Sequence, residues 1–566
     1  MRKIIFILIF LSLVIKLYSY WRIKRILFSP IGGTASYPIV VDSDHNGYNE
    51  IIFSIYRCWQ IWEYRPINQY YLVYADTGGY PGNIPGIETG NFEPKDVGDI
   101  DQDGLVDLVG PNVENVNDSF FPLVTTQESP DYHSYPESLS WWYRTSNEYA
   151  FSYTYYFTPD LDNDGKNEIL TYESWDSCPI VIIENISNNT NIPVWRKVNY
   201  GSGFAFGDFD GDRLKEFVTA SPGSSGRVFV FENTGDNQYQ LVKVDTVRLP
   251  NGSDVFSGND VDNDGKPEFF VGFAEWAGGH AWDFYLYMWE AVGNNNYQRT
   301  LIDRIRMDEL GRRSKCGDID GDGIEEIVWS IGGQVRVYKA IGNNQFQNVW
   351  FWRNDHGYPP TSIVNIYDVN GNGYNEILVS GYDHTSIFEI EAVQVLRPNG
   401  GEIFSGNSQE VIRWKTFYPP RCDSLSLYYS TDNGRTYHLI ASGIPGRETT
   451  YLWQVPNISS DSCKIRIVAY GPGWQFDESD MVFRIRETGI EEKFFKTFYI
   501  NISQNPIFSF DLSVESEIKI YDIKGNLIKK EKIKDGKKTK IFLKEMKSGI
   551  YFIEIGNKKG KIVLLK

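Results

Sequence analysis

The sequence predicts an all-β protein, and three observations support that fold class. Aromatic residues make up 15% of the 566 residues and glycine occurs 51 times, a combination typical of strands joined by many turns. Apolar and polar residues alternate over short runs such as Arg227–Glu232, whereas long helical periodicity is absent. A nine-residue acidic pattern also recurs seven times between Asp42 and Glu376. A chain of this length has room for about three or four domains.

The net charge of −19 is unevenly distributed along the chain. Residues 491–566 contain 17 Lys, no Arg and 10 acidic residues, so this segment carries +7 and residues 1–490 carry −26. The strong negative charge of residues 1–490 argues against nucleic acid as a partner and favours the binding of cations. The five cysteines are too few, and odd in number, for a disulfide scaffold. Cys422 and Cys463 each precede a predicted strand, and whether they pair stays open.

Residues 1–20 are predicted to be a signal peptide. Arg2 and Lys3 precede an apolar run from Ile4 to Ile15, which is shorter than the roughly 20 residues of a spanning helix. Such a run suits the core of a secretory signal peptide, and an uncleaved anchor is the alternative. In either case we expect the rest of the chain to leave the cytoplasm, with no transmembrane segment in the mature chain.

The acidic pattern in its fullest form is D-x-D-x-D-G-x-x-E, with acids at places one, three, five and nine and glycine at place six. The residues at the four acidic places are, in chain order, Asp42, Asp44, Asn46 and Glu50; Asp99, Asp101, Asp103 and Asp107; Asp160, Asp162, Asp164 and Glu168; Asp208, Asp210, Asp212 and Glu216; Asp260, Asp262, Asp264 and Glu268; Asp318, Asp320, Asp322 and Glu326; and Asp368, Asn370, Asn372 and Glu376. The fourth copy has Arg213 where glycine is expected. The seventh retains only two acids, so we expect it to bind a cation most weakly.

The spacing of the copies predicts a seven-bladed β-propeller over residues 21–390. Successive copies start 48 to 61 residues apart, a period typical of propellers. Between them lie four short strands, as at Phe204–Gly207, Glu216–Ala220, Arg227–Glu232 and Tyr239–Asp245, which is the composition of a propeller blade. The seventh unit supplies three strands. We expect the fourth from the start of the mature chain, residues 20–28, which would close the ring and remove exposed sheet edges.

Each copy has the chemistry of a cation-binding loop. Side chains at places one, three and five of a tight loop converge, glycine permits a left-handed turn, and the acid at place nine closes the set. Calcium takes 6–8 oxygen ligands at about 2.3–2.6 Å. An acidic turn without an ion is the alternative for one copy, but seven matching copies favour the cation. We therefore predict Ca²⁺, up to seven ions, in a structural role.

Residues 21–390 resemble the FG-GAP/VCBS repeat family, whose propeller repeats also occur in integrin α chains. The resemblance rests on segments such as Gly98–Gly104 and Gly317–Gly323. It implies that calcium lies in the loop between the first two strands of each blade, away from the ligand-binding face, and that places one, three, five and nine carry the ligands. The last place in the family is often Asp, whereas here it is mostly Glu.

Residues 391–487 are predicted to form an immunoglobulin/fibronectin-like β-sandwich. Short alternating strands recur there, for example Val411–Trp414, Ser424–Ser430 and Lys464–Ala469. The segment resembles bacterial immunoglobulin-like modules that begin with PNGGE and contain a YSTDNG hairpin. We expect Trp414 and Trp453 to lie in its core rather than to bind sugar.

Residues 493–566 resemble the type A C-terminal sorting domain of the type IX secretion system. The resemblance rests on Asn505–Pro506, Gly525, Ser548–Phe552 and the terminal Lys561–Lys566. It implies that the type IX secretion machinery is a partner. It also implies that this is a bacterial protein, secreted and either attached to the outer membrane or released. A lysine-rich β-sandwich without an address function is the alternative.

These features together predict a secreted or cell-surface binding or adhesion module, with a glycan or protein ligand. No serine, cysteine or histidine stands in a recognisable catalytic motif, so we expect no enzymatic activity. An extracellular polysaccharide-degrading enzyme of the lyase type, or a structural surface component, remains an alternative. Aromatic segments at Ser140–Arg144, Tyr153–Phe157 and Trp276–Trp282 are candidate ligand contacts. His45 lies within the first acidic copy and is expected to point outward.

Overall fold

The computed structural model describes most of the chain from residue 21 onward. The described residues are 21–29, 38–55, 58–65, 69–76, 87–88, 92–116, 119–144, 155–158, 160–172, 179–198, 200–221, 226–252, 254–279, 281–307, 313–353, 363–381, 385–488, 498–501, 507–510, 516–533, 539–543, 545–555 and 558–565. The predicted signal peptide lies outside them. All regular structure in this part of the chain is β-strand, as the composition predicts.

Residues 21–390 contain seven antiparallel sheets within the described ranges, which we number in chain order. The strands of sheets 1 to 3 are β2 (Ile39–Val41), β3 (Glu50–Ile55), β4 (Cys58–Arg65) and β5 (Gln69–Asp76); β6 (Ile87–Glu88), β7 (Asp96–Gly98), β8 (Asp107–Val116), β9 (Ser119–Glu128) and β10 (Ser138–Arg144); and β11 (Tyr155–Thr158), β12 (Glu168–Tyr172), β13 (Ile180–Ser187) and β14 (Thr190–Lys197).

The remaining four sheets follow the same order of strands. They consist of β15 (Ser202–Gly207), β16 (Glu216–Ala220), β17 (Arg227–Gly235) and β18 (Gln238–Thr246); β19 (Asp254–Gly258), β20 (Glu268–Gly278), β21 (Ala281–Gly293) and β22 (Asn296–Met307); β23 (Lys315–Gly317), β24 (Glu326–Ile331), β25 (Gln334–Gly342) and β26 (Gln345–Arg353); and β27 (Ile363–Tyr367), β28 (Glu376–Ser380), β29 (Thr385–Ile390) and β1 (Ile23–Ser29). Sheet 4 matches the four strands predicted for the fourth unit to within a few residues at each end.

Sheet 7 combines the two ends of residues 21–390. Strand β1 pairs antiparallel with β29, from Ile23 opposite Ile390 to Ser29 opposite Thr385. Just before β1, the Trp21 amide donates to the Val349 carbonyl oxygen at 2.9 Å. The prediction that residues 20–28 supply the missing fourth strand is therefore confirmed by β1.

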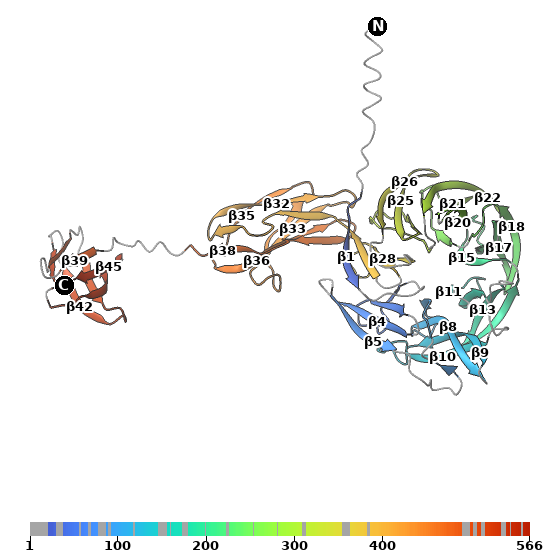
Figure 1. Cartoon of the computed structure of the whole chain (residues 1–566), viewed down its shortest axis with the longest axis horizontal. Helices are drawn as coiled ribbons and strands as arrows, with labels where there is room; N and C mark the ends of the chain where they lie inside the picture. Colours follow the sequence, from blue (N-terminus) through green and yellow to red (C-terminus); the bar gives the residue numbers. More distant parts are fainter. Residues whose placement is uncertain are drawn as a thin grey trace, which may run out of the picture.

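Each sheet shares a hydrophobic core with the next, and sheet 7 shares one with sheet 1. Between sheets 1 and 7, for example, Ile51 and Phe53 pack with Leu378 and Ile387. Figure 1 shows the sheets following one another around a common centre. Burial between neighbouring sheets explains why their second and third strands are almost continuously apolar, since both faces of such strands are covered. Equivalent shared cores join sheets 1 and 2, 2 and 3, 3 and 4, 4 and 5, 5 and 6, and 6 and 7.

The nine-residue copies occupy equivalent places in the seven sheets, and we call them acid loops one to seven. Each acid loop joins the first strand of its sheet to the second, which in sheet 2 are β7 and β8 because β6 is an additional short strand. The acid at place nine is the first residue of the second strand. Residues 155–157 of the aromatic segment predicted as a candidate ligand contact lie in the first strand of sheet 3, β11. Strand β11 pairs antiparallel with β12, and the third acid loop connects the two strands.

The second module, residues 391–487, has two sheets that enclose one core. Its strands are β30 (Val393–Arg397), β32 (Gln409–Thr416) and β35 (Thr450–Gln454) in one sheet, and β31 (Ile403–Ser405), β33 (Ser424–Ser430), β34 (His438–Pro445), β36 (Ser460–Tyr470), β37 (Trp474–Glu478) and β38 (Phe483–Arg486) in the other. Trp414 and Trp453 are 2% and 3% exposed within this core, as predicted. Cys422 and Cys463 are both free thiols.

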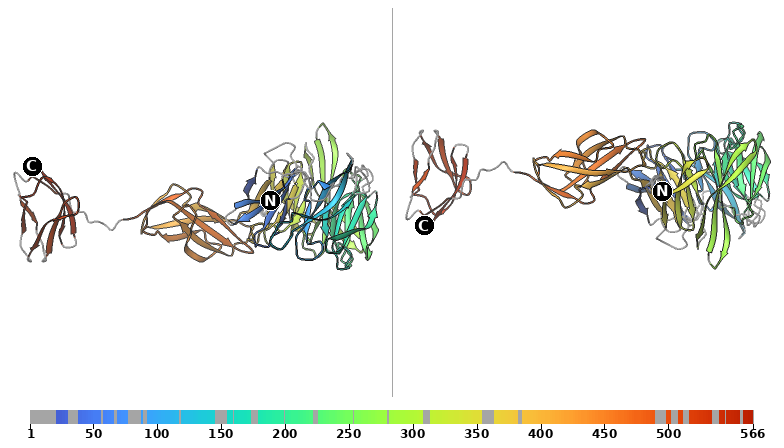
Figure 2. Two further views of the ribbon diagram at one scale, coloured as in Figure 1. Left: turned by 90° about the horizontal axis from the view of Figure 1, so that it is seen from below. Right: turned by 90° about the horizontal axis from the view of Figure 1, so that it is seen from above.

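The second module packs directly against sheet 7. Gln475 Nε2 donates to the carbonyl oxygen of Ile390 at the end of β29, and the Trp474 amide donates to the carbonyl oxygen of Asn372 in the seventh acid loop at 2.8 Å. Figure 2 shows this module, in orange, beside the ring of sheets. The hairpin between β36 and β37 therefore covers part of one acid loop.

The C-terminal segment forms a separate pair of small sheets. Their strands are β39 (Phe498–Asn501), β41 (Ser516–Tyr521), β42 (Leu527–Ile533), β44 (Gly549–Ile555) and β45 (Lys558–Leu565) in one sheet, and β40 (Ile507–Phe510) and β43 (Thr539–Phe542) in the other. Ile518, Ile520, Ile553 and Ile562 are among the residues of its core. Lys529, Lys530 and Lys532 lie on β42 at the edge of the larger sheet.

Candidate metal-binding loops

The acid at place one holds the loop backbone in shape. In the fifth acid loop, Asp260 Oδ1 accepts the Asp264 amide at 2.8 Å and Asp260 Oδ2 accepts the Gly265 amide at 3.0 Å. Equivalent bonds from the backbone of places five and six reach the first acid in the first, second and seventh loops. The first acid therefore shapes the loop as well as adding charge to it.

Place six requires a left-handed backbone, as the sequence predicts. Gly265 has φ of 93°, and the other five glycines at this place have φ between 86° and 92°. Arg213 in the fourth loop adopts φ of 76°, so it tolerates the conformation that glycine adopts freely. Place four is left-handed as well, a feature that sequence reasoning missed. Gly or Asn fills place four in five of the seven loops, His45 and Gln102 being the exceptions.

The acid at place nine leaves a buried oxygen without a partner. Glu216 is fully buried; its Oε2 accepts the Phe209 amide at 2.7 Å, while its Oε1 has no hydrogen-bond donor. Glu50, Glu168 and Glu268 repeat this arrangement. Because an unpaired buried carboxylate oxygen is costly, these atoms point to a missing positive partner.

Burial also raises the pKa of these carboxyl groups. It raises the pKa of Glu216 to about 9 and that of Glu168 and of Glu268 to about 8, and the neighbouring Asp residues of each loop add to the rise. The Glu50 pKa rises to about 8 for the same reason. A cation among these oxygens would reverse the shift, because it favours the ionised form.

A fifth acid, which sequence reasoning missed, faces place nine from the third strand. Glu216 lies opposite Glu232, and Glu268 lies opposite Glu290, as cross-strand neighbours. The residues at this third-strand position are Glu63, Glu128, Glu184, Glu232, Glu290, Lys339 and Glu389. They follow place nine by 13 to 22 residues, so no fixed spacing reveals them. A charged residue at the end of an otherwise apolar strand was the available signal.

A turn of the next sheet completes four of the loops. In the fourth loop the Asn295 amide donates to Asp210 Oδ2 at 2.6 Å, and Asn295 Nδ2 donates to Glu232 Oε2 at 2.7 Å. Asn189, Asn237 and Asn344 make the same pair of bonds to the second, third and fifth loops. These asparagines come from the turn between the third and fourth strands of the following sheet. Each such loop therefore bridges two sheets.

The structure brings most of the predicted site residues together. Ligand oxygens lie within 4.8 Å of one another in groups that include Asp160, Asp162, Asp164 and Glu168; Asp208, Asp210, Asp212 and Glu216; Asp260, Asp262, Asp264 and Glu268; Asp42, Asp44 and Glu50; and Asp99, Asp101 and Asp107. Within the first loop, Asn46 Nδ2 donates to Glu63 Oε2 at 2.5 Å. His45 stacks on Tyr132 at 3.8 Å, on the neighbouring sheet, so it is directed away from the carboxylates as expected.

This donor set fits a hard divalent cation. All the converging side chains offer oxygen, several of those oxygens are buried without a donor, and loops one to six supply three or four carboxylates each. Calcium prefers such a set, with flexible geometry and 6–8 oxygens. The acids at places one, three, five and nine could therefore hold a metal ion, and the third-strand acid lies beside the place-nine acid.

The candidate aromatic contacts divide into buried and exposed residues. Trp141 and Tyr143 pack against the core between sheets 2 and 3, whereas Trp142 is 41% exposed. Trp276, near the turn between β20 and β21, is 53% exposed and meets Trp282 edge to face at 5.1 Å.

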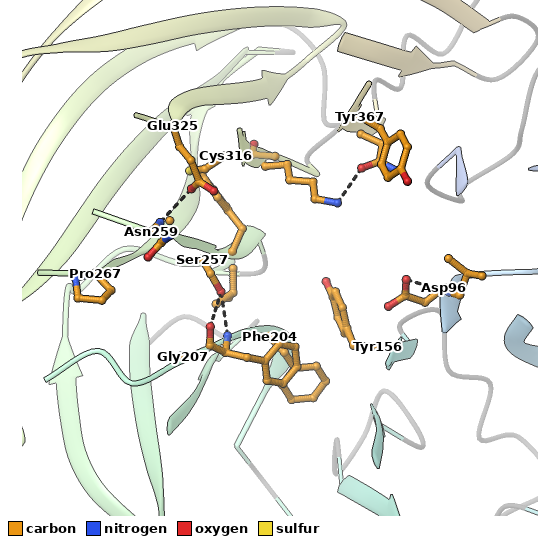
Figure 3. Close-up of a pocket in the computed structure, with 18 of the residues that line it drawn as sticks. Asp96, Tyr156, Phe204, Gly207, Ser257, Asn259, Pro267, Cys316, Glu325 and Tyr367 are labelled. Carbon is orange, nitrogen blue, oxygen red and sulfur yellow. Dashed lines mark hydrogen bonds between the residues drawn. The ribbon is translucent and has the colours of Figure 1, made fainter. Parts of the chain in front are cut away.

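A second candidate site is a cavity of about 850 Å³ between the sheets. Residues from the first strand of each of the seven sheets line it, and Figure 3 shows Tyr156, Tyr367 and Asp96 around it. Lys315 donates to Asn365 Oδ1 at 2.7 Å on the cavity wall. The enclosing strands lower the pKa of Lys315 by desolvation, and they raise that of Asp96 to about 6.

Comparisons with known proteins match two parts of the chain. Residues 208–271 and 318–379 match the FG-GAP-like repeat, and residues 497–565 match the secretion system C-terminal sorting domain. The chain is a secreted or cell-surface protein of a bacterium. Its sorting domain implies interaction with the type IX secretion machinery. Within the described residues, no helix has the length and apolar character needed to cross a membrane.

The other comparisons add little. No curated protein matches the chain. A solved structure described as a biofilm associated protein, BSP domain, is similar at 10% identity over 97% of this chain and 96% of that chain, with a TM-score of 0.14. A TM-score this low carries no argument about fold or function.

Replacing Arg213 by glycine should stabilise the protein. The substitution removes the strain of a left-handed backbone at an arginine. Glycine also increases the conformational entropy of the unfolded chain, which offsets part of this gain, so we expect the free energy of unfolding to rise by about 0.5–1 kcal/mol. Urea denaturation in the presence of calcium measures the change. The matched control is Gly265→Arg at the same place of the fifth loop, where open space surrounds the glycine and only the backbone is strained. It should lower stability by a similar amount, and equal stability of both variants would contradict the account.

The metal-free protein should lose stability as the pH rises. The place-nine carboxyl groups have pKa values of about 8 to 9 in the folded protein and near 4.5 in the unfolded chain. Between these pH values they are protonated in the folded protein and ionised in the unfolded chain. The folded state then binds more protons, so its advantage is complete below about pH 4.5 and is lost as the pH passes 8 to 9. Thermal unfolding of chelator-treated protein should show the melting temperature falling across this window by several degrees. Added calcium should remove the fall, and a melting temperature that rises instead would refute the assignment.

Proposed function

We propose that the seven sheets are the blades of a closed, integrin-α-like propeller whose acid loops hold structural Ca²⁺, and that this propeller is a binding or adhesion module at the bacterial surface. Buried oxygens without partners in four loops support the ion, and the shared cores and the β1–β29 pairing support the closed ring. In the same proposal the second module is an immunoglobulin/fibronectin-like β-sandwich, which extends the propeller on its C-terminal side.

The ligand surface in this proposal lies opposite the acid loops. The acid loops and the turns between third and fourth strands share one face, because those turns reach the neighbouring loops. In an antiparallel sheet, turns between second and third strands then fall on the other face. Their sequences do not repeat, so they are free to differ between blades and to carry specificity.

The proposal rests on the β20–β21 hairpin, the longest hairpin on that opposite face among the described residues. Strands β20 and β21 continue past the ends of most other strands, and Figure 2 shows this light-green sheet reaching beyond its neighbours. Trp276 and Trp282 form an exposed aromatic pair near its turn. An indole presented to solvent by a stiff hairpin is suited to stack on a sugar ring, because the apolar face of the sugar then leaves water.

The hairpin is braced from β22, the fourth strand of its sheet. Arg306 Nε donates to Asp283 Oδ1 at 2.7 Å and Arg304 Nη2 donates to Asp283 Oδ2 at 2.8 Å. These two guanidinium groups hold the pKa of Asp283 well below its usual range. Arg304 also lies 5.0 Å from the ring centroid of Tyr285. A glycan with acidic groups would meet both an aromatic face and two exposed cations here.

The central cavity supports a second candidate, a polysaccharide-degrading enzyme of the lyase type. A lysine whose pKa is lowered by burial is able to serve as a proton acceptor near neutral pH. Burial lowers the pKa of Lys315, and Asp96 and three tyrosines share its cavity. The binding proposal is preferred because the exposed tryptophan pair needs no reacting partner in the protein.

A glycan array, run with the calcium-loaded protein, tests the choice. We expect binding to one class of acidic or neutral polysaccharide, and a loss of at least about tenfold in affinity for Trp276→Ala, since a central aromatic contact is worth more than 1 kcal/mol. Trp142→Ala is the matched control, because that tryptophan is exposed on a different sheet. Unchanged affinity in Trp276→Ala would exclude this hairpin. Cleavage of the bound glycan, abolished by Lys315→Met, would favour the enzyme.

A further inference from the structure

The sixth acid loop differs from the others at one position. Its own residues, Asp318 to Glu326, follow the pattern in full, as those of the third and fifth copies do. On the third strand, however, Lys339 stands where the other six sheets carry Glu. Ile327 pairs with Tyr338, so the next pair along the two strands is Glu326 and Lys339.

The Lys339 ammonium lies among the acids of the loop. Its Nζ is 2.9 Å from Asp320 Oδ2, 2.8 Å from Asp322 Oδ2 and 2.7 Å from Glu326 Oε1. These are the acids of places three, five and nine. Glu326 is fully buried, and its Oε1 has a donor, whereas the same oxygen of Glu50, Glu168, Glu216 and Glu268 has none.

Two lysines elsewhere show that a nearby ammonium alone does not fill a loop. Lys166 and Lys266 occupy place seven of the third and fifth loops, where their side chains are 40% and 43% exposed. Each reaches the place-five acid and the third-strand Glu from the rim. The place-nine oxygens of Glu168 and Glu268 remain without a donor. Only Lys339 contacts place nine among these three lysines.

The position of the sixth loop in the ring explains why it has its own cation. In loops two to five, an asparagine from the third-to-fourth-strand turn of the next sheet binds the place-three acid. The sheet after the sixth loop is sheet 7, whose fourth strand is β1 from the start of the chain. No turn joins β29 to β1, because the chain continues from β29 into the second module. Trp21 lies there instead, with its ring centroid 5.5 Å from Lys339 Nζ.

We propose that the Lys339 ammonium permanently replaces the metal ion in the sixth acid loop, so that this loop binds no calcium although its sequence matches the calcium pattern in full. The inference rests on the proposed calcium sites of the other loops. An ion coordinated by the same three oxygens at about 2.3–2.6 Å would occupy the space of the ammonium. The two cations therefore exclude each other.

The replacement places a metal-independent loop beside the second module. Asp320, Asp322 and Lys339 line a cavity of about 830 Å³ together with Tyr418 and Pro472 of that module. The sixth loop can therefore keep its shape at this junction when calcium is withdrawn from the other loops.

Lysine labelling of the wild-type protein tests the inference without a variant. The protein is treated with an acetylating reagent, with calcium and with chelator, and peptides are quantified by mass spectrometry. We expect Lys339 to react at least about tenfold more slowly than Lys266 under both conditions. Its amine must first break a charge-assisted contact with an acid of the loop, and a cost of about 1.4 kcal/mol corresponds to a factor of ten. If calcium entered the sixth loop, Lys339 would be expelled and would react faster with calcium than without it. That result would overturn the inference.

Counting bound calcium by native mass spectrometry separates this inference from the proposed function. Wild type should bind at most six ions, and Lys339→Glu, which restores the acid found in the other sheets, should bind one more than wild type. Lys266→Glu is the matched control and should leave the count unchanged. Seven ions on wild type, or no additional ion on folded Lys339→Glu, would refute the role of Lys339. No calcium on any of the three proteins would instead refute the proposed calcium sites.

Discussion

The structure depends on neutralising groups of carboxylates that are buried at the junctions between sheets. Each acid loop gathers carboxylates from its own nine residues, and most loops add a Glu from the third strand. The place-nine acid is fully buried and one of its oxygens has no donor in four loops. Such a group of like charges is stable only with a proton or a cation, and a divalent cation suits the oxygen set better at neutral pH.

The same loops hold the sheets in order. An asparagine from the following sheet binds the place-three acid and the third-strand Glu, as Asn295 does with Asp210 and Glu232. A cation in the loop would thus stabilise two neighbouring sheets at once. The shared hydrophobic cores supply the other contact between neighbours. Sheet 7 has no third-to-fourth-strand turn because β1 closes it, and at the sixth loop Lys339 supplies the positive charge.

Much of this arrangement could be predicted because it is local in sequence. Places one to nine, the glycine turn and the pairing of β1 with β29 follow from short patterns and from counting strands. The third-strand acids could not be predicted in the same way, because hairpins of different length put them 13 to 22 residues after place nine. The bridging asparagines belong to another unit altogether. Lys339 also shows that a perfect nonapeptide does not by itself identify a metal site, since the deciding residue comes from a neighbouring strand.

The central claim is that cations in the acid loops hold the ring of sheets together. Thermal unfolding of the mature protein, with calcium and after removal verified by elemental analysis, tests it most directly. A site filled at 100 times its Kd contributes about 2.7 kcal/mol, and several sites act together, so the account predicts that removal lowers the melting temperature by more than about 10 °C. Re-addition of calcium should restore it. An unchanged melting temperature in protein shown to be free of metal would contradict the account.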